Sequence, residues 1–103
     1  MGFSIEKIEF NIVALRGEIS DLLDVYIPQD STKIYNMVKE IGEMGKVEDF
    51  EERREKRGKI SSQIQKMLVD NKLSESVIKK ITDQIIIYGG LCQYVATERK
   101  KIV

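Results

Sequence analysis

The chain has 103 residues, enough for one domain, and its 17 Lys and Arg residues balance 17 Asp and Glu residues, so its formal charge is zero. With 42% hydrophobic and 33% charged residues it fits a compact folded protein and not a disordered chain. It has no histidine and a single cysteine, Cys92, which excludes a disulfide framework, a Cys/His metal site within one chain and any histidine base.

The sequence shows no sign of export, membrane insertion or nucleic-acid binding. Residues 1–15 alternate apolar and charged side chains and form no apolar signal block. The longest apolar run, residues 85–92, is far shorter than the roughly 20 residues that span a bilayer. Phosphate recognition usually brings a basic excess, which this neutral chain lacks. We therefore expect a soluble cytoplasmic protein with neither a membrane nor a nucleic acid as partner.

The first expected element is a long amphipathic helix over residues 4–27. Apolar side chains recur along it at spacings of three and four, which places one apolar stripe on a single helix face. The stripe consists of Ile5, Ile8, Ile12, Leu15, Ile19, Leu22 and Tyr26. Ser4 is a good N-cap residue. Pro28 ends the helix, because it lacks an amide proton and disfavours a helical conformation at the residue before it.

Two further helices are expected over residues 32–44 and 50–70. Gly42 and Gly45 help to end the shorter helix. The longer helix begins with an almost wholly charged stretch, residues 51–57. The residues expected to face the core are Ile34, Met37, Val38 and Ile41 in the shorter helix and Ile60, Ile64, Met67 and Leu68 in the longer one.

The last expected helix covers residues 74–98. Ser74 is a good N-cap residue, and Leu73 and Ile78 are placed to form a hydrophobic staple. Its apolar stripe consists of Ile78, Ile81, Ile85, Tyr88, Cys92 and Val95. Short connections join all four helices, so we expect a single all-α domain over residues 1–103, with amphipathic helices packed in an antiparallel bundle.

Two glycines inside the last expected helix need an explanation. Gly89 and Gly90 each cost about 1 kcal/mol relative to alanine in a helix interior. Close approach of another helix, or a local kink, would explain them. The alternative is a hollow beside the helix in which a small ligand lies. Gln93 favours the alternative, because it follows Gly89 by four residues and therefore lies on the same helix face.

The charged start of the third helix has five cations among residues 53–59. Pairs such as Glu51 with Arg54 and Glu52 with Lys56 would make it a solvated helix face. The alternative is a local anion site built from one or two of these cations, despite the zero net charge of the chain.

Arg16 lies at the flank of the first apolar stripe, directly after Leu15. The simpler interpretation is a surface arginine whose stem covers apolar surface, and the alternative is a ligand-binding arginine. Cys92 is interpreted as a core residue, because it lies on the apolar stripe with no histidine or second thiol to activate it.

Several short motifs follow one another along the chain. Residues 15–19 are Leu-Arg-Gly-Glu-Ile, residues 41–46 contain Ile-Gly followed by a lysine, and residues 54–55 are Arg-Glu. Residues 73–93 comprise a leucine turn, an amphipathic helix, an Ile-Ile pair, a small residue and a glutamine four positions on. In this order and approximate spacing they resemble the motifs of the small all-helical chorismate mutases, in which the lysine after Ile-Gly comes one residue earlier.

The resemblance implies a diverged member of that family with a type II-like chorismate mutase fold. Such an isomerase converts chorismate to prephenate in aromatic amino acid biosynthesis, the shikimate pathway, by an intramolecular rearrangement without cofactor, metal or nucleophile. Catalysis comes from holding a dicarboxylate in a compact conformer and stabilising the negative charge that develops on its ether oxygen. The resemblance also implies a homodimer with chorismate as its small-molecule partner.

Carried over by motif, the resemblance implies roles for individual residues. Lys46 and Gln93 would be catalytic and would face the ether oxygen. Arg16 and Arg54 would bind the carboxylates, and Glu55 would accept a hydrogen bond from the substrate hydroxyl.

Three further positions complete the implied substrate site. Lys33 is the only cation in residues 29–34, where the family has a second arginine. Counting back from the leucine turn places the family's Arg-Glu pair at residues 56–57, so Arg57 is the alternative to Arg54. Gly89 occupies the position of the family's serine, four residues before the glutamine.

A second class of function fits the same sequence. A helical-bundle binding or regulatory protein without catalytic activity, such as an immunity or inhibitor protein, needs only a stable bundle and an exposed patch. An oligomer formed by the first helix as a coiled coil is a weaker alternative, because three or so heptads here lack e/g charge pairing. A catalytic site predicts that Arg16, Lys46 and Gln93 converge on one cavity, whereas a binding bundle predicts that they point in different directions.

Overall fold

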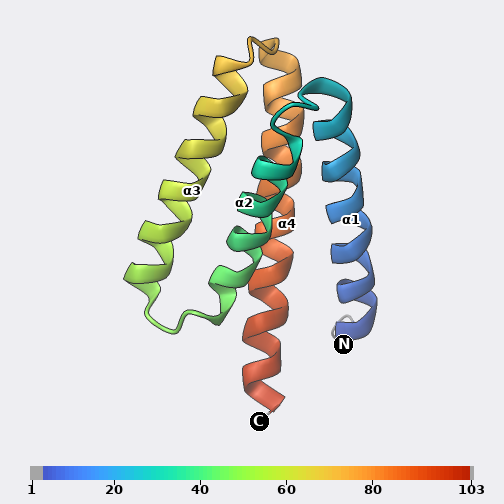
Figure 1. Ribbon diagram of the computed structural model, residues 1–103. Helices are drawn as coiled ribbons and strands as arrows, with labels where there is room; N and C mark the ends of the chain where they lie inside the picture. The colour runs from blue at the N-terminus through green and yellow to red at the C-terminus, as the bar shows by residue number, and fades with distance from the viewer. Residues whose placement is uncertain (1–3, 103) are drawn as a thin grey trace.

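The computed structural model describes residues 4–102, and this part of the chain contains helices and no strands. The elements are α1 (Ile5–Tyr26), α2 (Ser31–Glu43), the short 3-10 helix η1 (Met44–Lys46), α3 (Phe50–Asp70) and α4 (Glu75–Ile102). The four α-helices alternate in direction (Figure 1). The all-α prediction is confirmed, and the expected boundaries agree within one residue except at the end of α4.

The last helix continues to Ile102, so the expected end at residue 98 was wrong. Arg99 forms an ion pair with Glu9 of α1, which holds this end of α4 against α1. Arg99, Lys100 and Lys101 all lie in the last turn, where cations are favoured by the partial negative charge of a helix C-terminus. The charges that follow residue 98 therefore stabilise the helix instead of ending it.

The chain folds back on itself at Pro28. The Ile27 amide donates to the Leu23 carbonyl at 2.8 Å, and the Ser31 hydroxyl donates to the Pro28 carbonyl at 3.2 Å. This turn lets α2 return beside α1, and α1 also packs along α4 of the same chain. The first helix thus completes a helical bundle within one chain.

Asn71 ties the two turns at this end of the molecule together. Its side-chain nitrogen donates to Asp30 at 2.9 Å and to the Met67 carbonyl at 2.8 Å, and its oxygen accepts a hydrogen bond from Gln29. Near this turn α3 approaches α4, and toward Phe50 the two helices separate (Figure 1). The open end of this helix pair contains the first candidate site described below.

The hydrophobic core lies between α4, α1 and α2, with α3 covering one side. Its buried residues are Ile19, Leu23, Ile27, Ile34, Val38, Ile41, Ile64, Leu68, Ile81, Ile85 and Tyr88. Leu23 and Ile27 are fully buried although the predicted stripe omitted them, and Tyr26, which it included, is 40% exposed. An α-helix has 3.6 residues per turn, so a strict alternation of three-residue and four-residue steps gradually leaves the helix face that packs on the core. Two successive steps of four from Ile19 stay on that face and reach Leu23 and Ile27.

Gly42 and Gly45 do not end α2 as predicted. Neither has a positive φ, and the chain continues from α2 directly into η1. Instead, both glycines lie against α4. A Cβ on Gly42 would lie 2.7 Å from the Tyr88 hydroxyl, and a Cβ on Gly45 would lie 2.9 Å from Ala96 Cβ. The glycines allow α2 and η1 to approach α4 more closely than any side chain would permit.

Candidate functional site

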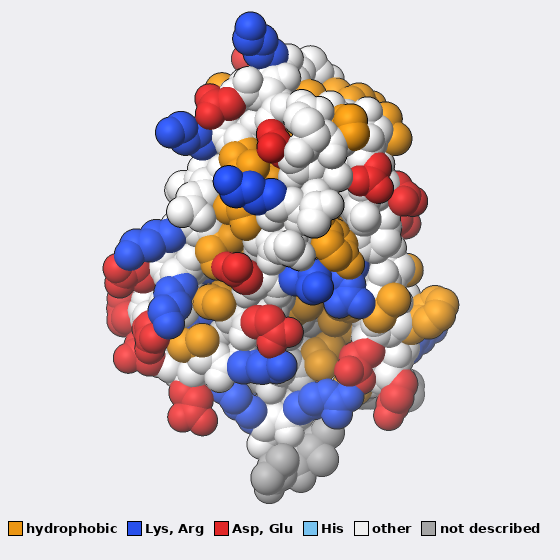
Figure 2. Space-filling view, in the orientation of Figure 1, with side chains coloured by type: hydrophobic (Ala, Val, Ile, Leu, Met, Phe, Trp, Pro, Cys, Tyr) orange, Lys and Arg blue, Asp and Glu red, His pale blue; other side chains and the backbone are white. Residues whose placement is uncertain are grey.

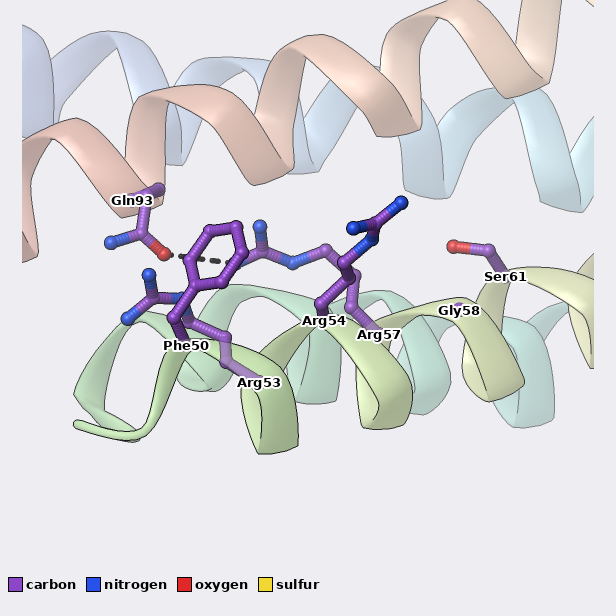
Figure 3. A pocket seen from close by; sticks show the side chains of 7 residues that line it. All are labelled: Phe50, Arg53, Arg54, Arg57, Gly58, Ser61 and Gln93. Carbon is purple, nitrogen blue, oxygen red and sulfur yellow. Dashed lines mark hydrogen bonds between the residues drawn. The ribbon is translucent and has the colours of Figure 1, made fainter.

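A cleft of about 400 Å³ opens between α3 and α4 at the end where the two helices separate. We call it the α3/α4 cleft. It is lined by Phe50, Arg53, Arg54, Arg57, Gly58, Ser61 and Gln93 (Figure 3). Three arginines at helical spacing on one helix thus line a cleft that Gln93 lines from the other, and of the three only Arg57 is hydrogen-bonded to Gln93 (Figure 3). They make a cationic hollow in a chain of zero net charge.

Arg57 and Gln93 are joined across the cleft. The Arg57 Nη2 group donates to Gln93 Oε1 at 3.1 Å, and Gln93 Nε2 donates in turn to Thr97 Oγ1 at 3.3 Å. The Arg57 Nε atom is buried and has no hydrogen-bond partner. Burial and the nearby Arg53 lower the pKa of Arg57, but a guanidinium stays protonated at any physiological pH. The half-buried charge lacks a counterion, so an anion in the cleft would be stabilised.

The other two arginines of the cleft also lack a carboxylate partner. Arg53 donates to the Val47 carbonyl at 3.0 Å, and its guanidinium lies 5.4 Å from the centroid of the Phe50 ring. Arg54 is exposed. None of the ion pairs within residues 4–102 includes Arg53, Arg54 or Arg57.

The lysines of the same helix behave differently. Lys56 pairs with Glu52 at 2.8 Å, as expected for a solvated helix face, and Lys59 pairs with Glu55 at 3.5 Å. The charged start of α3 therefore has two faces: lysines neutralised by glutamates on one, and arginines without counterions on the other.

The cleft continues along α4 as an apolar hollow of about 290 Å³. The two hollows share Arg57 and Ser61, and the second is otherwise lined by Ile41, Ile85, Ile86, Gly89 and Gly90. A Cβ on Gly89 would lie 3.1 Å from Ile41 Cγ2, so this glycine serves the close approach of α2. Gly90 has no atom within 4 Å of the Cβ position and opens to the hollow. Close approach of another helix thus explains Gly89, and a hollow lies beside Gly90; that a ligand occupies this hollow stays a prediction.

A second cleft of about 520 Å³ lies between α1, η1 and α4, and we call it the α1/α4 cleft. Arg16 and Lys46 line it together with Cys92, whereas Gln93 lines only the α3/α4 cleft. The three residues expected to converge on one cavity are therefore divided between two. The two clefts are separated by η1, which packs directly on α4: the Cβ position of Gly45 is only 3.4 Å from the Cys92 carbonyl and 3.6 Å from Gln93 Cα.

The remaining predicted residues lie outside both clefts or at an edge. Lys33 is exposed near the start of α2 and lines neither cleft. Glu55 is exposed and directed to Lys59. Phe50 and Ser61 were not predicted, and Arg53 was predicted only as one of five cations that could form an anion site. The spacing of four from Arg53 to Arg57, and again from Arg57 to Ser61, is the sequence signal that would have identified two of them.

The side chains of Tyr88 and Cys92 lie against Gly42 of α2: a Cβ on Gly42 would be 2.7 Å from the Tyr88 hydroxyl and 3.2 Å from Cys92 Sγ. Burial raises the pKa of Tyr88 to about 12, and Cys92 acts in the same direction while Arg16 opposes it. Burial also raises the pKa of the Cys92 thiol. A buried thiol with a raised pKa is a poor nucleophile, which agrees with the interpretation of Cys92 as a packing residue.

We expect the stability of the protein to fall as the pH rises from 10 toward 12. Tyr88 of the unfolded chain loses its proton near its ordinary pKa of 10.0, whereas the folded chain holds it until about 12, so the folded state binds more protons in this window. Urea midpoints at pH 8 and pH 11 measure the loss. Tyr88→Phe should show a smaller loss, with Cys92 supplying the remainder, and an equal loss in both proteins would contradict the assignment.

No protein-family model, curated protein or solved structure matches this chain. Within residues 4–102, no helix has both the length and the apolar character needed to cross a membrane. No three His, Cys, Asp or Glu side chains in that part of the chain lie close enough together to hold a metal ion.

Proposed function

We propose that the α3/α4 cleft binds a small dicarboxylate and that the protein is an isomerase of the chorismate mutase type. The observation that carries the proposal is the Arg57–Gln93 pair, in which a half-buried cation without a counterion is held by an amide at 3.1 Å. Arg54 lines the same cleft, and two guanidinium groups suit two carboxylates. These residues include Arg57 and Gln93 from the motifs that resemble the family.

The arrangement fits the chemistry of an intramolecular rearrangement. The arginines would hold the carboxylates, and the ring would lie along the apolar hollow at Gly89 and Gly90. Gln93 Nε2 makes only a long hydrogen bond of 3.3 Å to Thr97, so it can turn to the ether oxygen as negative charge develops there. Such a reaction requires positioning and charge stabilisation and no nucleophile.

The test is the loss of chorismate absorbance in the ultraviolet with purified protein. We expect turnover by the unaltered chain and a loss of about a hundredfold in Gln93→Ala, since a donor to the developing charge is removed. Gln63→Ala is the matched control, because Gln63 is exposed on α3 and lines neither cleft. Absence of turnover from folded, helical protein would contradict the proposal.

Arg16→Ala shows whether both clefts serve one reaction. The resemblance implies that Arg16 and Lys46 act with Gln93, and they face the α1/α4 cleft. Retained turnover in Arg16→Ala would restrict the reaction to the α3/α4 cleft, and lost turnover would assign it to both clefts. The homodimer stays a prediction, which sedimentation equilibrium tests. A cytoplasmic role in aromatic amino acid biosynthesis belongs to the proposal that the protein is an isomerase of the chorismate mutase type.

The second candidate is a binding or regulatory bundle without catalytic activity. It is favoured by large apolar side chains on the surface: Phe10 is 73% exposed on α1, and Ile86 is 65% exposed on α4. A folded protein without turnover, in which Phe10→Ser or Ile86→Ser changes the oligomeric state, would support this candidate.

A further inference from the structure

The α1/α4 cleft combines an apolar floor with a cationic rim. Its apolar lining consists of Ile12 and Val13 from α1 and Val95 and Ala96 from α4. Figure 2 shows Lys and Arg side chains around an apolar hollow in the lower middle of the molecule, the region where α1 and α4 run side by side in Figure 1. At about 520 Å³ it is larger than the α3/α4 cleft, and more apolar side chains line it, whereas Phe50 is the one apolar side chain among the lining residues of the α3/α4 cleft.

The charges at the rim are unequal. Arg16, Lys46, Arg99 and Lys100 line the cleft, and Glu9 is the one carboxylate among its lining residues. Glu9 pairs with Arg99, and Lys46 pairs with Glu43 at 2.7 Å. No ion pair formed within residues 4–102 includes Arg16 or Lys100. Two cations therefore remain without counterions beside an apolar surface.

Arg16 is the cation best placed to select a ligand. It is half-buried and lies near the hydroxyl of Tyr88 and the thiol of Cys92, which are uncharged at neutral pH and offer no counterion; burial raises the pKa of both groups further. Its position on α1 is set by the buried residue Ile19, which anchors the following turn of the helix in the core. The guanidinium is thus held at the edge of the apolar floor, and no carboxylate of the described chain satisfies it.

We propose that the α1/α4 cleft binds a single amphipathic carboxylate, such as a medium-chain fatty acid, with its carboxylate on Arg16 and its apolar body along Val13 and Val95. The compact arginine cluster of the α3/α4 cleft suits a polar dianion, whereas an apolar floor with cations at its rim suits one charge on an apolar body. The surface is concave, which suits one molecule better than a flat lipid bilayer. The proposal does not require the activity proposed for the α3/α4 cleft, although it assigns to Arg16 a different ligand from the one that the family resemblance implies.

The first experiment is calorimetric titration with decanoate below its micelle-forming concentration, beside decanol as the uncharged analogue. We expect decanoate to bind about tenfold more tightly than decanol, since a charge-assisted hydrogen bond to a guanidinium is lost in the alcohol. Equal affinity for the two would overturn the proposal. Binding to phosphatidylglycerol vesicles without binding of free decanoate would also overturn it, in favour of a membrane-facing patch.

Variants then locate the site. Arg16→Gln should weaken decanoate binding about tenfold, and Lys66→Gln, an exposed cation of α3 that lines neither cleft, should leave it unchanged. Val13→Asp places a carboxylate on the apolar lining of the cleft, where it repels the carboxylate of decanoate, and Val13 is already 57% exposed. Val25→Asp is the matched control, because Val25 lies on the same helix and is 73% exposed. Circular dichroism checks that each variant is folded. Decanoate binding that is unchanged in both Arg16→Gln and Val13→Asp would place the ligand elsewhere and overturn the proposal.

Discussion

Arg57→Ala is expected to reduce kcat/KM for chorismate at least about a hundredfold while the protein keeps its helical fold. The variant removes the guanidinium whose Nη2 group donates to Gln93 Oε1 across the α3/α4 cleft. The proposed contact with a substrate carboxylate and the hydrogen bond that orients the Gln93 amide are lost together. Initial rates of the loss of chorismate absorbance give kcat/KM, and circular dichroism checks that the variant is folded.

Two control variants test whether the loss of turnover is specific to the guanidinium of Arg57. Lys66→Ala removes a cation from the same helix, where Lys66 is exposed and outside the cleft, and should leave turnover unchanged. Arg57→Lys keeps the charge but loses the planar fork that matches a carboxylate, so it should recover only part of the activity. Full turnover in Arg57→Ala would show that the α3/α4 cleft is not where the substrate binds.

Gly45→Ala is expected to destabilise the protein by about 1–3 kcal/mol, as overpacking of a tight contact does. The added methyl group would lie 2.9 Å from Ala96 Cβ, closer than real Cβ atoms approach, whereas its 3.4 Å distance to the Cys92 carbonyl is an ordinary contact. Because the position of Ala96 Cβ is fixed by the backbone of α4, no rotamer change relieves the contact, and η1 must move away. A lower urea midpoint with an unchanged m-value measures the effect.

Gly17→Ala is the matched control for this effect. Gly17 lies inside α1, is exposed and has no atom within 4 Å of the Cβ position. Alanine there should stabilise the protein by about 0.5–1 kcal/mol, because glycine carries the larger entropic cost in a helix interior. If Gly45→Ala also raised the urea midpoint, the close contact of η1 with α4 would be wrong.

The helices themselves could be predicted from local patterns. Apolar residues at spacings of three and four, serines before the first turns, and Pro28 after α1 are sufficient, because helix formation depends on neighbours within a few residues along the chain. The serine caps are present: Ser4 Oγ accepts from the Lys7 amide at 3.5 Å, and Ser74 Oγ accepts from the Val77 amide at 3.3 Å. The end of α4 was predicted wrongly, because an ion pair with α1 extends it.

The candidate residues illustrate what local patterns leave open. Spacing identified Arg16 and Gln93 as residues at the flanks of apolar stripes, the family resemblance added Arg57 as the alternative to Arg54, and all three line clefts. It could not assign them to the same or to different clefts. Successive residues on a helix point about 100° apart, so Cys92 and Gln93 open to different sides of α4 once another segment packs between them. That segment is η1 at Gly45, some fifty residues away in sequence. Its close contact with α4 separates Arg16, in the α1/α4 cleft, from Arg57 and Gln93, in the α3/α4 cleft.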